Sequence, residues 1–245
     1  MPRFFVPPDQ IRDGRFFISG SEAHHALHVL RKGPGDLLEI FDGRDSSYQG
    51  RIEHVETDRL DGVLLSAPAS PRTSTENLRV ILVQALIRGS KWDWLIEKCS
   101  ELGVSALWPL RAARSIVKVS DDRSKEERWN RIALAAAKQC GRGDVMTIER
   151  PADLSAILGR RTPGSLSLIP WEKESDRSIA EACRGYRGDM VYVFVGPEGG
   201  WESQETQMAC EAGVKPVRLG ATLLRSETAG LVSATLVLGE LGSYR

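Results

Sequence analysis

Residues 67–75, with the sequence Ala-Pro-Ala-Ser-Pro-Arg-Thr-Ser-Thr, separate two parts of the chain whose hydrophobic residues follow different patterns. A run of proline, serine and threonine of this kind interrupts regular structure and is typical of a linker. We therefore expect two domains, which comprise residues 1–70 and 76–245.

Before the linker, short apolar runs alternate with Gly, Asp and Pro turns, which predicts a small β-barrel or meander. One helix is expected to interrupt these strands, with Ser21 as its N-cap and Gly33 at its stop. The predicted strands have the sequences RFFV, RFFIS, DLLEIFDG, YQGRIEHVE and RLDGVLLS.

After the linker, strands alternate with helices, which predicts an α/β domain with a parallel sheet covered by helices. Strands are expected at 78–86, 105–110, 165–170, 190–195 and 215–219, and helices at 90–102, 123–141, 176–184, 203–212 and 227–241. Helical spacing predicts two buried faces. These faces carry Trp94, Leu95, Cys99 and Leu102 in the first helix, and Trp129, Ile132, Ala133, Ala136 and Cys140 in the second.

The composition, with 41% hydrophobic and 27% charged residues, is that of a soluble globular protein. No segment approaches the roughly 20 consecutive apolar residues of a membrane span, and the start, MPRFFVPPDQ, lacks the apolar run of a signal peptide. We therefore expect a cytoplasmic protein without a membrane segment. The four cysteines are scattered singly and are expected to be reduced core thiols.

The net charge is zero, but residues 86–142 carry 12 basic and 7 acidic side chains. This excess predicts a phosphate-facing surface, although solvated helix faces are the commoner explanation of a charge run. The cations available for such a surface include Arg88, Lys91, Arg111, Arg114, Lys118, Arg128, Arg131, Lys138 and Arg142.

Two unusual loops follow predicted parallel strands, and in such sheets ligands bind beyond the carboxyl ends of the strands. The loop Gly196-Pro-Glu-Gly-Gly-Trp201 has glycines that let the backbone approach a ligand, and the carboxylate of Glu198. The loop 219–229 carries Arg225 and precedes an apolar helix, which we expect to be buried, against this domain or a partner subunit. No GxxxxGK[ST] or GxGxxG motif is present, which argues against ATP hydrolysis and a Rossmann site.

GPEGGW, followed by Glu202 and Glu205, and then RLGATLLRSETA resemble the two C-terminal motifs of the SPOUT superfamily. Their form is that of the small-subunit ribosomal RNA uridine-N3 methyltransferases. The resemblance extends to Gln139-Cys-Gly-Arg142, to EKCSELGV and to HHALHVLRKGPGD, and so covers nearly the whole chain. Lys138 is a departure, because this family usually has Glu before the glutamine.

The resemblance implies a PUA-like β-barrel, joined to an α/β domain with a trefoil knot that binds S-adenosylmethionine. It also implies a homodimer that acts on ribosomal RNA or on the small ribosomal subunit. The residues expected to line the cofactor pocket are Gly196, Glu198, Gly199, Leu219, Gly220 and Leu224, and those expected to contact RNA are Arg111, Arg114, Lys138, Gln139 and Arg142.

Methylation at uridine N3 requires that the ring lose its proton and that the negative charge on its oxygens be stabilised. Arg142 and Arg225 are our candidates for holding RNA phosphate or base oxygens, and Glu198 is our first candidate for the proton acceptor, before Glu227. Each has a structural alternative: Arg142 could only cap its helix, and Glu198 could only accept hydrogen bonds within its loop.

Aromatic and histidine side chains give weaker signals. Trp171 and Trp201 could stack on a base, although core or rim packing is favoured for both. His24 and His28 share a helical face with His25 beside them, but no fourth ligand is evident and no metal is expected. Two alternative functions remain: a related SPOUT enzyme that methylates a ribose 2′-hydroxyl or another base, and a non-catalytic RNA-binding or ribosome-assembly factor.

Overall fold

The computed structural model describes residues 3–66, 78–117 and 123–242, which form two compact units. Unit 1 comprises residues 1–73 and 137–145, and unit 2 comprises residues 74–136 and 146–245. Residues 137–145 therefore pack within unit 1, whereas the sequence assigned them to the domain 76–245. The predicted linker at 67–75 and Lys118 lie outside the described residues.

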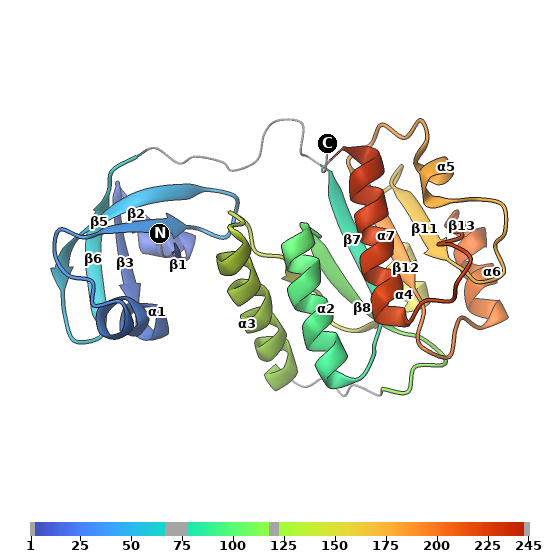
Figure 1. Cartoon of the computed structure of the whole chain (residues 1–245), viewed down its shortest axis with the longest axis horizontal. Coiled ribbons are helices and arrows are strands. Elements are labelled where there is room, and N and C mark those ends of the chain that lie inside the picture. The colour runs from blue at the N-terminus through green and yellow to red at the C-terminus, as the bar shows by residue number, and fades with distance from the viewer. Residues whose placement is uncertain (1–2, 67–77, 118–122, 243–245) are drawn as a thin grey trace. The chain divides into compact units, whose positions relative to one another are not determined.

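Unit 1 is built on a six-stranded sheet with the order β1-β4-β5-β6-β3-β2, drawn in blue in Figure 1. β1 and β4 pair in parallel, and all other neighbours in this sheet are antiparallel. The strands predicted before the linker are confirmed, and β2 and a short 3-10 helix, η1 (Pro8–Gln10), add to them. The strands are β1 (Arg3–Phe5), β2 (Ile11–Arg12), β3 (Arg15–Ser19), β4 (Leu37–Phe41), β5 (Ser47–Val55) and β6 (Arg59–Leu64).

Phe16 belongs to the core of unit 1, and its ring lies against two glycines of neighbouring strands. A Cβ at Gly50 would come within 2.7 Å of the Phe16 ring, and one at Gly62 within 2.6 Å. Any side chain at these positions would displace the ring, because protein cores are close-packed. The alternating pattern of β3 thus buries Phe16 and Ile18 and leaves Arg15 outside.

The helix of unit 1 differs from its prediction at both ends. It begins as α1 (Gly20–His24), with Ser19 rather than Ser21 at the N-cap position, and continues as a π-helical turn, η2 (His25–Val29). The backbone N–H of Leu30 donates to the carbonyl of His25, a five-residue step that the 3.6-residue pattern could not indicate.

Unit 2 has a parallel sheet with the order β10-β8-β7-β12-β11-β13, and β9 also pairs with β8. The α/β class and the parallel sheet are thus as expected. β9, β10 and helix α4 were not predicted. The strands are β7 (Arg79–Ala85), β8 (Ala106–Arg111), β9 (Thr147–Ile148), β10 (Ala152–Asp153), β11 (Leu166–Pro170), β12 (Met190–Val195) and β13 (Lys215–Val217).

Helices cover both faces of this sheet. α7 packs on β7 and β12 and contacts α2 and α5, and it crosses in front of the sheet in Figure 1. The opposite face packs Ile81 and Val83 against residues of α4 and α6. The helices are α2 (Gly89–Leu102), α3 (Arg123–Cys140), α4 (Leu154–Gly159), α5 (Ile179–Cys183), α6 (Ser203–Glu211) and α7 (Ser226–Leu241). None of the described helices combines the length and apolarity needed to cross a membrane.

Two predicted helix faces are wrong in part. In α2 the buried tryptophan is Trp92, whose ring lies 5.5 Å from that of Trp129, whereas Trp94 is 44% exposed. Tryptophans two residues apart point to different sides of a helix, so only one of them could face the core. In α3, Cys140 is exposed and Ile132 is half-buried, while Ala137 is fully buried.

Candidate functional site

A pocket of about 590 Å³ opens at the carboxyl ends of β11, β12 and β13 in unit 2. Three loops form its wall: residues 170–174 after β11, residues 196–201 after β12, and residues 218–226 between β13 and α7. Parallel strands end at the same edge of a sheet, which brings these loops together although they are far apart in the sequence. The volume lies within the range of pockets that take a cofactor-sized ligand.

The loop 196–201 is packed too tightly for side chains at two of its glycines. A Cβ at Gly196 would lie 3.0 Å from Nε1 of Trp201, and a Cβ at Gly199 would lie 3.1 Å from Cβ of Arg114. Gly200 has a φ of 70°, a conformation that side chains disfavour. Here the glycines admit neighbouring side chains of the protein itself, and Trp201 is a buried core residue.

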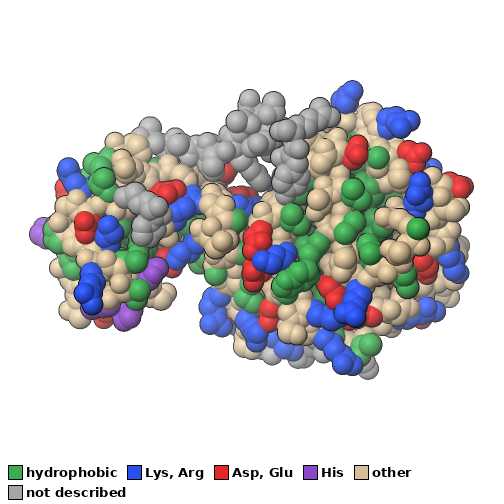
Figure 2. All heavy atoms as spheres, viewed as in Figure 1, with side chains coloured by type: hydrophobic (Ala, Val, Ile, Leu, Met, Phe, Trp, Pro, Cys, Tyr) green, Lys and Arg blue, Asp and Glu red, His purple; other side chains and the backbone are tan. Residues whose placement is uncertain are grey.

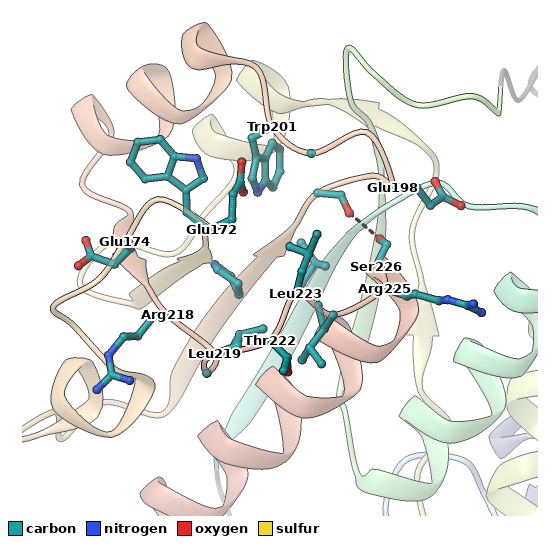
Figure 3. A pocket seen from close by; sticks show the side chains of 18 of the residues that line it. Glu172, Glu174, Glu198, Trp201, Arg218, Leu219, Thr222, Leu223, Arg225 and Ser226 are labelled. Atoms are coloured by element: carbon teal, nitrogen blue, oxygen red, sulfur yellow. Dashed lines mark hydrogen bonds between the residues drawn. The ribbon is translucent and has the colours of Figure 1, made fainter.

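The loop 218–226 lines the pocket with its backbone and with apolar side chains. Gly220 takes a φ of 151°, and Leu223 is 87% exposed. The hydroxyl of Ser226 donates a hydrogen bond of 2.5 Å to the carbonyl of Gly196, drawn as a dashed line in Figure 3. This bond ties the loop after β13 to the loop after β12.

The loop after β11 supplies the third wall, and no cofactor-binding residue was predicted in it. Trp171, Glu172 and Glu174 line the pocket. The backbone N–H groups of Arg177 and Asp176 donate to Glu174 Oε1 at 3.0 and 2.7 Å and hold the pKa of this carboxyl below its ordinary value. The signal available in the sequence was the position of these residues, directly after a buried strand.

The structure brings together all the residues expected to bind the cofactor. These residues, Gly196, Glu198, Gly199, Leu219, Gly220 and Leu224, line the pocket, and so does the predicted catalytic Arg225. The lining residues without a predicted role in binding or catalysis are Pro170, Glu172, Glu174, Val195, Pro197, Arg218, Ala221, Thr222, Leu223, Ser226 and Ala229.

Glu198 and Arg225 lie at one edge of the pocket and point away from Trp201 and Arg218 (Figure 3). Both side chains belong to exposed residues, and neither makes a hydrogen bond or ion pair with another residue that the structure describes. The structural alternative for Glu198, hydrogen bonds within its own loop, is therefore not observed. Both charges remain available to a ligand.

Glu227, the second candidate for a proton acceptor, does not line the pocket. Its carboxylate is largely buried, and Oε1 pairs with Nζ of Lys91 at 2.8 Å. Burial raises the pKa of Glu227, but hydrogen bonds from Lys91 and from its own backbone, with nearby positive charge, outweigh burial and leave the pKa below its ordinary value. This arrangement makes Glu227 an ion-pair partner at the start of α7.

Arg142, Lys138 and Gln139 belong to unit 1, whereas the pocket belongs to unit 2. The Arg142 guanidinium binds Asp144 through two hydrogen bonds, at 3.0 and 2.9 Å, and is largely buried. Lys138 donates to both carboxylate oxygens of Glu22, at 2.7 and 2.8 Å, while Gln139 is exposed. Ion pairs thus give both cations a structural role within unit 1.

Arg111 is the last residue of β8 in unit 2, and Arg114 lies three residues after it. Arg114 Nη1 donates to the carbonyl of Gly199 at 3.2 Å, so this predicted RNA-contacting residue holds the outer side of the pocket loop. Arg111 is half-buried. Figure 2 shows Lys and Arg side chains along the lower edge of unit 2, with acidic side chains among them.

Comparisons with known proteins agree with this arrangement. Residues 74–238 match the model of an RNA methyltransferase domain, and residues 18–65 match that of an RNA methyltransferase PUA domain. The chain is 28% identical over 247 residues to "Ribosomal RNA small subunit methyltransferase E" of Bacillus subtilis, which covers 97% of this chain and 96% of that protein.

Solved structures show the same fold over the whole chain. A ribosomal RNA small subunit methyltransferase E from Neisseria gonorrhoeae, bound to S-adenosyl methionine, superposes with a TM-score of 0.87 at 28% identity and covers 100% of both chains. A putative methyltransferase from Legionella pneumophila, in complex with the same cofactor, superposes with a TM-score of 0.82 at 25% identity and covers 97% of both chains.

Proposed function

The chain belongs to the RNA methyltransferase family, and we propose that it transfers a methyl group from S-adenosylmethionine to N3 of a uridine in small-subunit ribosomal RNA. The observation that carries this proposal is the pocket, in which the loops with the sequences GPEGGW and LGATLLRS meet at the ends of β12 and β13. The name of the Bacillus subtilis relative supports the substrate class.

The pocket fits S-adenosylmethionine in size and in chemistry. Its walls combine apolar side chains, such as Leu219 and Leu224, with the backbone of Gly196, Gly199 and Gly220. Three carboxylates, Glu172, Glu174 and Glu198, complement a ligand that carries positive charge at its sulfur and amino groups. Two solved relatives bind this cofactor.

When bound, the cofactor supplies an electrophilic methyl group. The protein has to place N3 of the uridine in line with that group, accept the N3 proton and stabilise charge on the flanking oxygens. Glu198 accepts the proton in this proposal, because its carboxylate is at the pocket edge and bonds to no described residue. Arg225, at the same edge, donates to a base oxygen or a phosphate.

Arg142 is retained as an RNA-contacting residue in this proposal, although its guanidinium is bound to Asp144. The two hydrogen bonds to Asp144 hold the guanidinium in a fixed orientation. A side chain that is already ordered loses less entropy when it contacts a ligand.

Unit 1 binds the RNA in this proposal. Its match to an RNA methyltransferase PUA domain over residues 18–65 supports the assignment, as does its six-stranded sheet, which we propose closes as a PUA-like barrel. In unit 2 we propose the trefoil knot of the SPOUT family. The bond from Ser226 to Gly196 supports it, because the chain returns after β13 to the loop that follows β12.

A homodimer is the proposed assembly, and α7 supports it. Leu231 and Val232 are half-buried in the single chain, and Leu236 is 40% exposed, on a helix with one carboxylate in its last two turns. Apolar side chains gather over α7 and the neighbouring part of α2 in Figure 2. Light scattering should then give a dimer for the native chain and a monomer for Leu236→Glu.

The test of the reaction uses the purified protein, S-adenosylmethionine and small ribosomal subunits from cells that lack the enzyme. We expect 3-methyluridine in the nuclease digest of the RNA. A methylated ribose or another methylated base would keep the family and overturn the target. Cofactor binding without any methylated nucleoside, on subunits and on naked RNA alike, would favour a binding protein.

A further inference from the structure

A polar side chain lies inside the apolar sheet of unit 2, next to the pocket. Gln84 is fully buried near the end of β7, and its partner in the sheet register is Val195, which directly precedes Gly196. Burying an amide costs free energy unless its groups are hydrogen-bonded. The hydrogen bonds of Gln84 therefore indicate why an amide is tolerated at this buried position.

Gln84 Nε2 donates to Oγ of Ser226 at 2.7 Å, and Ser226 Oγ donates to the carbonyl of Gly196. A hydroxyl has one proton, and a carbonyl can only accept, so the Ser226 proton must go to Gly196. Ser226 Oγ is then an acceptor towards Gln84, which fixes the orientation of the amide. The three residues form a chain of hydrogen bonds with one direction, from β7 through α7 to the loop after β12.

The carbonyl of Gly196 is the one polar group by which its peptide plane can be held. The next residue is Pro197, which has no N–H, so the peptide between them has an acceptor and no donor. Gly196 has no side chain to restrict it either. Ser226 therefore fixes the orientation of a peptide that lines the pocket.

Gly230 keeps the other side of Gln84 close to α7. A Cβ at Gly230 would lie 2.4 Å from Gln84 Oε1 and 3.3 Å from a methyl of Leu82. Oε1 has no hydrogen-bond partner among the described residues, so the amide is held there by packing against the α7 backbone. Gly230 thus leaves the space that the Gln84 amide occupies.

We propose that Gln84 and Ser226 are positioning residues, which fix the Gly196 peptide in the orientation that S-adenosylmethionine requires. The inference rests on the proposed function, because it takes this cofactor as the ligand of the pocket. Neither residue supplies a proton or a charge to the reaction. Their effect is to remove alternative orientations of the loop before the ligand arrives, which raises affinity.

The test measures the Kd of S-adenosylmethionine by calorimetry on the full chain, and Tm by scanning calorimetry. Ser226→Ala and Gln84→Met are each expected to raise Kd by about two- to twelve-fold, the range that corresponds to one hydrogen bond. Because both act through one chain of bonds, the double variant should bind no more weakly than the weaker single variant.

Ser233→Ala is the matched control. Ser233 is a buried serine of the same helix, and its hydroxyl donates to the carbonyl of Ala229 within α7. A role in helix stability alone would lower Tm in both serine variants and leave Kd unchanged. We expect Ser233→Ala to change only Tm, whereas Ser226→Ala changes Kd.

Wild-type affinity in Ser226→Ala, or losses in the double variant that multiply, would overturn the inference. Should Gln84→Met fail to fold, the comparison of the two serine variants decides the question by itself. Failure of the unaltered chain to bind S-adenosylmethionine would instead overturn the proposed function, so the two failures are distinguishable.

Discussion

Gly196→Ala tests whether the pocket loop depends on its contact with Trp201. The backbone of Gly196 is not in the left-handed region, so alanine adds steric contact without backbone strain. Its Cβ would lie 3.0 Å from Cε2 and Nε1 and 3.2 Å from Cδ1 of the indole. Trp201 is 5% exposed and packs in the sheet core, so the ring cannot turn aside freely.

Overpacking of this kind costs about 1–3 kcal/mol. For a unit of this size the expected fall in Tm is about 2–10 °C. We also expect weaker binding of S-adenosylmethionine, because any shift that relieves the contact moves the loop. Scanning and titration calorimetry on the same preparation measure both effects.

A second substitution makes the test specific. Trp201→Phe removes the pyrrole edge of the indole, which is the part that the new Cβ would contact. By itself it leaves a cavity that costs about 1–2 kcal/mol. The two changes together should cost clearly less than their sum, since each compensates for the other. Additive losses, or a Gly196→Ala variant with native Tm and affinity, would refute the reasoning.

Three further predictions concern other parts of the chain. Arg142→Ala should keep the affinity for S-adenosylmethionine by calorimetry while methylation of small subunits falls about ten-fold or more; unchanged turnover would remove Arg142 from the mechanism. The lowered pKa of Glu227 stabilises the fold above the ordinary carboxyl pKa, and this contribution is lost as the pH falls through the folded value. Lys91→Met should therefore flatten the dependence of urea unfolding on pH between about 3 and 6, and an unchanged profile would contradict the role of the pair. Burial raises the pKa of Cys183 to about 11, so iodoacetamide should modify exposed Cys210 in the native protein and reach Cys183 only after unfolding, as peptide mass spectrometry can show.

The pocket could be predicted where its loops carried a local signal. The loop 196–201 has three glycines after an apolar strand, and the loop 219–229 has Gly220 and Arg225 after the next one, so two of the three walls were recognisable. The loop after β11 carries Glu172 and Glu174 without glycine, which reads as an ordinary solvated turn. This loop lines the pocket because β11 lies between β12 and β13 in the sheet. The order of strands in a sheet cannot be predicted from a local sequence pattern.

Ion pairs with residues outside the segment explain what charge counting within it could not predict. The excess of cations in residues 86–142 counts only the charges of that segment. Three of its cations pair with carboxylates outside it: Lys138 with Glu22, Arg142 with Asp144, and Lys91 with Glu227. Each pair reduces the local charge available to a phosphate, because an ion pair presents a weaker field than a free cation.

The contact of Gln84, in contrast, left a signal in the sequence. This signal is a polar residue inside the predicted apolar strand 78–86. A single amide among Val, Ile, Leu and Ala in a central parallel strand has no water to bond with, so it requires a partner on the element that covers it. That element is α7, and the partner is Ser226, 142 residues away in the sequence. The same reasoning explains why Ser226 begins a helix without capping it: its hydroxyl bonds outside α7, to Gly196. Gln84 in the buried strand and Ser226 at the start of α7 are thus the two partners of one contact. This contact lies where the loops after β12 and β13 meet at the pocket.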